Sequence, residues 1–134
     1  MTSALIEHLK TKQDAVVYNT SALGFVPLAA TAVYSSTTAA LHSYVMSQRF
    51  ILKGGGVRLL EIAPPWVRTD LMNSREVEQA MPIDQFIEET IAVLGTDAVE
   101  ILVGAAKLLR NNLGPGEHGF VNGFNEQMTV VFAR

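Results

Sequence analysis

Cysteine is absent from the 134 residues, which excludes disulfides and thiolate chemistry and leaves the redox compartment undetermined. No run of five like charges occurs, and the net charge of −3 with a pI near 5.5 argues against a nucleic-acid partner. The longest apolar stretches, such as residues 25–33, fall short of the roughly 20 residues of a membrane span. Residues 1–8 lack the basic segment of a signal peptide. We expect a cytoplasmic protein without a membrane partner.

Apolar residues are plentiful, at 49% of the chain, and can build the core of a single domain over residues 1–134. Short β-rich runs predict strands at residues 15–19 and 57–62. Apolar side chains at helical spacing predict the helices, which cover residues 3–10, 33–50, 82–94 and 98–110. The tail favours a helix over residues 120–128 and a terminal strand at 130–132.

The alternation of strands and helices predicts a helix-rich α/β fold with few parallel strands and right-handed crossovers. A sheet normally needs three or more strands to be stable by itself, and two are predicted here with clarity. We therefore expect part of a doubly wound fold.

Ser21 and Tyr34 stand thirteen positions apart, and Thr38 follows one helical turn beyond Tyr34. A serine and a Tyr-x-x-x-Lys pattern at this spacing form the acid–base site of short-chain dehydrogenases/reductases. Residues 19–38 resemble that site, with threonine at the lysine position. The resemblance implies a Rossmann-like fold in which Ser21 orients a small carbonyl or alcohol substrate and Tyr34 transfers its proton.

The lysine matters because a phenol loses its proton only near pH 10 unless a cation stabilises the phenolate. In the family this lysine also holds the nicotinamide ribose. Thr38, at the lysine position, could offer the ribose a hydrogen bond but has no charge. His42 is rotated by about 80° from Tyr34 on an ideal helix, so we do not expect it to replace the lysine.

Residues 63–69 resemble the family's loop after the sixth strand, whose backbone and threonine contact the nicotinamide end of NAD or NADP. The resemblance assigns Pro64 and Thr69 to the cofactor. Pro65 replaces the usual glycine, as in the DltE-like subgroup, which residues 109–117 also resemble. The three histidines lack metal-ligand spacing. We expect no metal and place the histidines at the surface or at helix caps.

The resemblance covers only the C-terminal half of a family member. The glycine-rich phosphate turn would lie upstream of Met1, and residues 54–56 follow a helix and precede a strand, the reverse of a phosphate loop. We expect a truncated relative that lacks the N-terminal nucleotide-binding half and binds no cofactor alone. In such a pseudoenzyme, Ser21 and Tyr34 are remnants.

An uncovered strand edge at residues 15–19 would be unusual. We therefore expect a homo-oligomer, such as a homodimer, formed at that edge or through the helices at residues 33–50 and 98–110. The alternative is an active NAD(P)-dependent oxidoreductase that uses Ser21 and Tyr34, with its cofactor half supplied by another chain or absent from this chain alone. A third hypothesis is that the chain is a fragment of a larger reductase.

Overall fold

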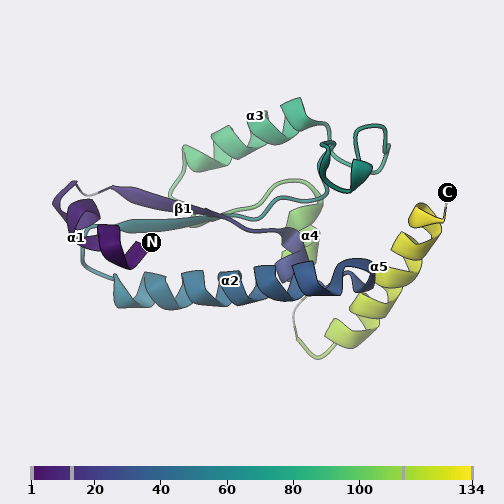
Figure 1. Ribbon diagram of the computed structural model, residues 1–134, viewed down its shortest axis with the longest axis horizontal. Coiled ribbons are helices and arrows are strands. Elements are labelled where there is room, and N and C mark those ends of the chain that lie inside the picture. Colours follow the sequence, from purple (N-terminus) through teal and green to yellow (C-terminus); the bar gives the residue numbers. More distant parts are fainter. Residues whose placement is uncertain (1, 13, 113, 134) are drawn as a thin grey trace.

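A three-stranded parallel sheet lies at the centre of the computed structural model (Figure 1). β1 (Ala15–Asn19) pairs with β2 (Arg58–Ile62), and β2 pairs with β3 (Glu100–Ile101). Because the strand order is β1-β2-β3, β1 and β3 are the edges of the sheet as far as it is described. The described residues are 2–12, 14–112 and 114–133.

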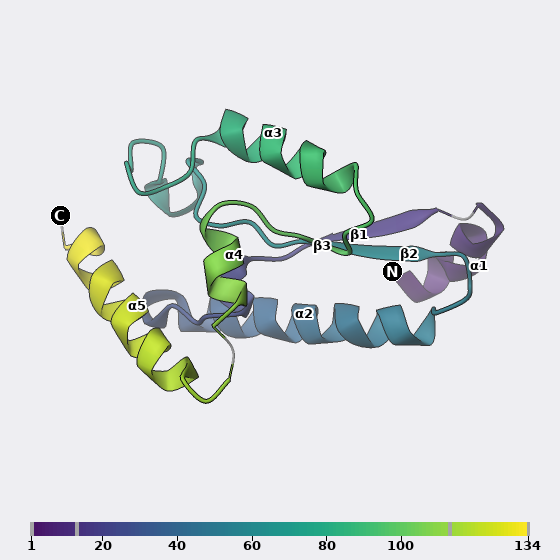
Figure 2. The same cartoon turned by 180° about the vertical axis from the view of Figure 1, so that it is seen from behind.

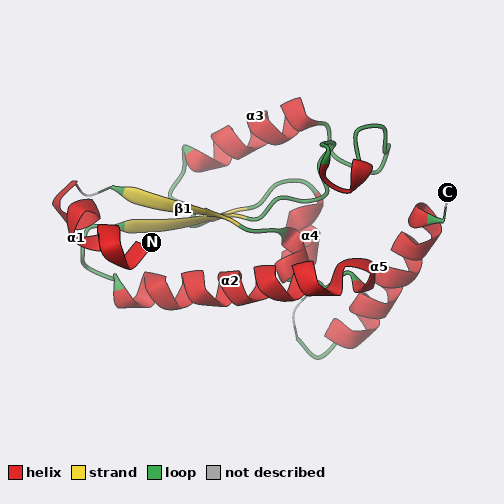
Figure 3. Cartoon of the chain, viewed as in Figure 1, coloured by secondary structure: helices red, strands yellow, loops and turns green. Residues whose placement is uncertain are grey.

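Helices cover both faces of the sheet, so the chain forms three layers. The α-helices are α1 (Thr2–Lys12), α2 (Ala32–Ile51), α3 (Ile83–Leu94), α4 (Ala105–Arg110) and α5 (Glu117–Phe132). Views from opposite sides show α2 along one face and α3 along the other (Figures 1 and 2). The helix α5 stands at the end of the molecule opposite α1 (Figure 3). None of the described helices is long and apolar enough to cross a membrane.

The buried face of α2 explains how this helix is held against the sheet. Its buried residues recur at intervals of three and four positions, as expected for one face of a helix, and they are Ser35, Thr38, His42 and Val45. Three of the four are polar. The helix ends shortly before Gly54, whose φ of +84° suits glycine.

The sequence predicted the two longer strands and the helices around α2 and α3, and the structure confirms them with small shifts at their ends. The predicted helix over residues 98–110 is wrong in its first part, because residues 100–101 form β3 and the helix begins at Ala105. Backbone pairing decides this: the Glu61 N–H donates to the Val99 carbonyl at 2.9 Å.

The predicted terminal strand at residues 130–132 is also wrong, since α5 continues to Phe132. A strand needs a neighbour to pair its backbone groups, and the helix instead supplies partners such as the Ala133 N–H donating to the Thr129 carbonyl. The buried core lies beside α4 and contains Ala22, Phe25, Val26, Ala63, Ala106 and Leu109. Phe120, Val121 and Phe124 of α5 pack against it.

Candidate active site

A cavity of about 830 Å³ lies where β1 and β2 end. Ligands in open parallel sheets bind beyond the carboxyl ends of the strands, and the cavity wall includes Thr20, directly after β1, and Pro64, two residues after β2. Of the predicted site residues, Ser21, Tyr34, Pro64 and Thr69 line this cavity. Thr38 is not part of its wall.

Ser21 follows β1 in extended backbone geometry. Its Oγ accepts a hydrogen bond from the Leu23 N–H at 3.1 Å and so caps the short 3₁₀ helix Ala22–Gly24. Within the described chain the Ser21 hydroxyl has no acceptor for its own hydrogen. It can therefore donate that hydrogen to a ligand oxygen in the cavity.

Tyr34 lies in the first turn of α2, with 38% of its surface exposed. Its backbone carbonyl accepts the hydroxyls of Thr37 and Thr38, but its phenol makes no hydrogen bond with the residues that the structure describes. The Ser21 and Tyr34 hydroxyls are thus both available to a ligand in the same cavity. Both hydroxyls are groups that can hydrogen-bond to a ligand oxygen.

Thr38 is buried and its hydroxyl is bonded within its own helix. The Thr38 Oγ1 donates to the backbone carbonyls of Tyr34 at 3.1 Å and Ser35 at 3.0 Å. Its backbone also packs closely on Gly24, where an added Cβ would lie 3.2 Å from the Thr38 carbonyl. A lysine here could extend past this contact, whereas the short threonine side chain stays in the helix.

Two further residues assigned to the cofactor are also engaged by the chain itself. The Pro64 carbonyl accepts the Ala22 N–H at 2.9 Å. The Thr69 N–H donates to Ser74 Oγ at 3.1 Å, and Thr69 Oγ1 accepts the Leu71 N–H at 3.2 Å. Pro64 and Thr69 thus hold the loop in place through these contacts while they also line the cavity. The cofactor roles of Thr38, Pro64 and Thr69 stay predictions.

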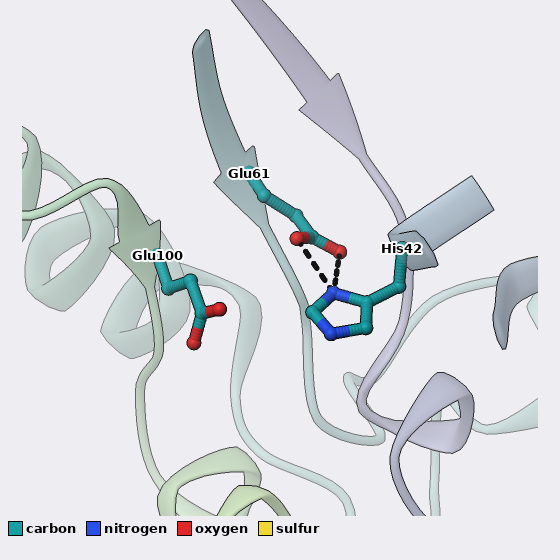
Figure 4. A group of neighbouring side chains, drawn as sticks. All are labelled: His42, Glu61 and Glu100. Carbon is teal, nitrogen blue, oxygen red and sulfur yellow. Dashed lines mark hydrogen bonds and ion pairs between the residues drawn. The ribbon is translucent and has the colours of Figure 1, made fainter. Parts of the chain in front are cut away.

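A buried polar cluster lies behind the cavity wall, and the sequence interpretation missed it. Glu61, the next-to-last residue of β2, is fully buried, and its carboxylate lies 2.8 Å from His42 Nδ1 (Figure 4). The prediction that the histidines lie at the surface or at caps is wrong for His42, which is buried on the inner face of α2. A glutamate between the apolar residues Leu60 and Ile62 of a buried strand was the signal that could have revealed a buried partner.

Two arginines complete this cluster. Arg110 donates two hydrogen bonds to the Glu100 carboxylate, at 2.9 and 3.2 Å. Arg49 lies between both carboxylates, 3.8 Å from Glu61 and 3.7 Å from Glu100. The hydrogen bond from Arg110 lowers the pKa of Glu100 below its ordinary value and outweighs the opposing effect of partial burial.

The ligand atoms of His42, Glu61 and Glu100 lie within 4.8 Å of one another and could in principle surround a metal ion (Figure 4). The two arginines argue against that use. Arg49 and Arg110 already balance the charges of the two carboxylates, and a divalent cation would be repelled by both guanidinium groups. The arrangement is that of an ion-paired structural cluster, and the absence of a metal stays a prediction.

The cluster and the cavity meet at Thr20. Thr20 Oγ1 donates to Glu61 at 2.8 Å, and the Thr20 N–H donates to the Ile62 carbonyl at 2.8 Å. Because Ser21 is the next residue, the buried carboxylate of Glu61 helps to fix the position of the Ser21 hydroxyl.

Comparisons with known proteins identify the family of this chain. Residues 1–80 match the short chain dehydrogenase family. The chain belongs to this family. It is 40% identical over 73 residues to the uncharacterized oxidoreductase DltE of Bacillus subtilis (strain 168), a match that covers 54% of this chain and 29% of that protein.

Solved short-chain dehydrogenases share the fold. The structure from Burkholderia cenocepacia J2315, in complex with NADP, has a TM-score of 0.77 and 21% identity and matches 90% of this chain. The structure from Sphingobium yanoikuyae, in complex with NADPH, has a TM-score of 0.66 and 13% identity and matches 96% of this chain. The chain spans 51% and 50% of those two chains. These matches confirm the Rossmann-like α/β fold.

Proposed function

We propose that this short chain dehydrogenase relative retains a site for a carbonyl or alcohol oxygen but is impaired in NAD(P)-dependent oxidoreduction. The observation that carries the proposal is the contrast between neighbouring turns of α2. Tyr34 faces the cavity with an unbonded hydroxyl, whereas Thr38 is bonded to its own helix. Ser21 and Tyr34 can bind an oxygen, but the charge that would stabilise a phenolate is missing.

The nearby cations do not replace the lysine. Arg49 and Arg110 are held by Glu61 and Glu100, and neither lines the cavity. His42 is likewise held by Glu61 and lies outside the cavity wall. Proton transfer by a positioned side chain typically contributes 10²–10⁴-fold to a rate, so a tyrosine without its cation leaves the reaction slow.

The substitution Thr38→Lys tests this proposal. We expect Thr38→Lys to raise the rate of NADP- or NAD-dependent turnover of small ketones and alcohols by at least about 10-fold at unsaturating cofactor concentration, since it restores the cation beside Tyr34. Thr37→Lys is the matched control, because it adds the same charge one residue away on the exposed side of α2. Turnover is followed by nicotinamide absorbance.

Wild-type turnover as fast as that of Thr38→Lys would contradict the proposal. Such turnover would favour the alternative of an active oxidoreductase. If the turnover appeared only after a second chain was added, that chain would supply the cofactor contacts. Equal gains in Thr37→Lys and Thr38→Lys would show that the position of the charge is unimportant.

We also propose that the chain self-associates. β1 is an edge of the described sheet, and its Val17 is 48% exposed. On α2, Val33 and Phe50 are 78% and 79% exposed. Bare strand edges and exposed apolar side chains both favour association.

Sedimentation velocity at micromolar concentration tests the self-association. We expect a dimer or a larger species in the wild type. Val17→Lys should weaken it if the strand edge forms the contact, and Phe50→Asp should weaken it if α2 does. A stable wild-type monomer would contradict the proposal.

A further inference from the structure

We propose that the cavity at Ser21 and Tyr34 selects a neutral, apolar ketone or alcohol, and that the inner face of α5 holds the hydrocarbon part of this ligand. The oxygen end of the proposal rests on the proposed function. The placement of the hydrocarbon part rests on the cavity wall alone. The oxygen site and the apolar site can therefore be refuted separately.

The charge of the wall is the first observation. Among the described residues, those that line the cavity include no lysine, arginine, histidine, aspartate or glutamate. Large apolar side chains surround it instead, among them Trp66, Met72, Ile83, Phe86, Phe120 and Phe124. A carboxylate or phosphate placed there would lose its hydration without gaining a counter-charge. A neutral ligand avoids that penalty.

The polar hydroxyls are the second observation. Ser21 lies at the end of β1 and Tyr34 at the start of α2, and the hydroxyls of both are available. Pockets of this kind combine a mostly apolar wall with a few polar groups that fix the ligand's orientation. We therefore place the ligand oxygen at these two hydroxyls.

The glycines of α5 are the third observation. Gly119 and Gly123 are one helical turn apart and both line the cavity. A Cβ built at either position would meet no atom within 4 Å. The missing side chains therefore leave room that a ligand can fill, between Phe120 and Phe124 on the same helix.

α5 is attached to the body by few polar contacts. Asn125 accepts the Ala29 N–H and donates to the Pro27 carbonyl at 3.0 Å. Near its other end the Phe132 ring lies 5.5 Å from the Trp66 ring. No side chain of α5 is fully buried in the described structure. An apolar ligand would add to the packing that Phe120 and Phe124 already make against the core.

Trp66 provides the measurement, because it is the single tryptophan of the chain and it lines the cavity. The intact protein is titrated with benzylacetone, with butylbenzene, which lacks the oxygen, and with phenylbutyrate, which is ionised near neutral pH. Trp66 emission is followed, with calorimetry as a second measurement. We expect saturable binding of benzylacetone and at least about 10-fold weaker binding of phenylbutyrate. Phenylbutyrate binding as tightly as the ketone, or no ketone binding by either method, would overturn the proposal.

Gly123→Leu tests the wall itself. It fills the space in front of α5 and should weaken benzylacetone and butylbenzene by at least about 10-fold. Asn122→Leu is the control, since Asn122 is an exposed neighbour on the same helix that does not line the cavity. Unchanged affinity in Gly123→Leu, or equal losses in both variants, would overturn the role of α5.

Tyr34→Phe separates this proposal from the proposed function. We expect it to weaken benzylacetone binding, because one of the two hydroxyls at the ligand oxygen is lost, and to leave butylbenzene binding unchanged. If benzylacetone and butylbenzene bind with the same affinity in the wild type and in Tyr34→Phe, the apolar wall binds ligands as proposed. The proposed oxygen site would then be wrong.

Discussion

The cavity and the buried polar cluster lie at the same end of the sheet and differ in charge. The cavity wall carries hydroxyls but no charged side chain among the residues that the structure describes. The cluster behind it holds two carboxylates and two arginines, and Glu61 is completely buried. Thr20 belongs to both, since it lines the cavity and donates to Glu61.

This difference shows that the charged side chains near the site belong to the cluster and not to the cavity wall. The arginines near the site are tied to carboxylates and stabilise the ends of the strands, so they are unavailable to a ligand. α2 contributes to both regions, with Tyr34 towards the cavity and His42 towards the cluster. On the proposed function, a threonine in place of lysine at position 38 would change the chemistry of the site while leaving the contacts of the cluster intact.

The largest expected effect comes from breaking the cluster at its buried centre. Glu61→Gln removes the charge that His42 and Arg49 face, and we expect the free energy of unfolding to fall by about 3 kcal/mol, because removing one partner of a buried ion pair leaves the others uncompensated. Urea unfolding followed by circular dichroism measures the change.

The matched control is Glu88→Gln, which removes an exposed carboxylate on α3. Surface substitutions of this kind usually change the free energy of unfolding by less than about 0.5 kcal/mol. Equal effects of the two substitutions would show that the cluster is not a stabilising part of the fold.

A smaller and pH-dependent effect is expected at Glu100. Its folded pKa is lowered mainly by the hydrogen bond from Arg110, so its contribution to stability is present above the pKa of the unfolded carboxyl group. That contribution is lost as the pH falls through the lowered folded pKa. Glu100→Gln should therefore cost roughly 1 kcal/mol near neutral pH and less at about pH 3. Urea unfolding at both pH values measures this, and a cost that grows in acid would contradict the assignment.

Local sequence patterns predicted the elements that carry a recognisable run of β-forming residues or a helical spacing of apolar residues. The strand at residues 15–19 and the helix α2 are examples. β3 could not be predicted in this way, because two residues carry no pattern and become a strand only through hydrogen bonds with β2. Its position depends on packing that brings residues 61 and 100 together.

The site was predictable in part for the same reason. Ser21 and Tyr34 were predicted from their spacing in a family motif, and both line the same cavity. The pair of His42 and Glu61 joins a helix to a strand 19 positions along the chain, a contact that no local pattern specifies. The burial of the Thr38 hydroxyl in its own helix likewise required the three-dimensional structure.

The central claim is that the chain keeps its site for a neutral ligand and lacks an effective site for the cofactor. A parallel titration of the wild-type protein with benzylacetone and with NADPH tests it most directly, by Trp66 emission for the ketone and nicotinamide fluorescence for NADPH. We predict saturable binding of the ketone and no saturable binding of NADPH up to about 1 mM, the upper end of ordinary KM values. Saturable NADPH binding, or the absence of ketone binding, would contradict this account.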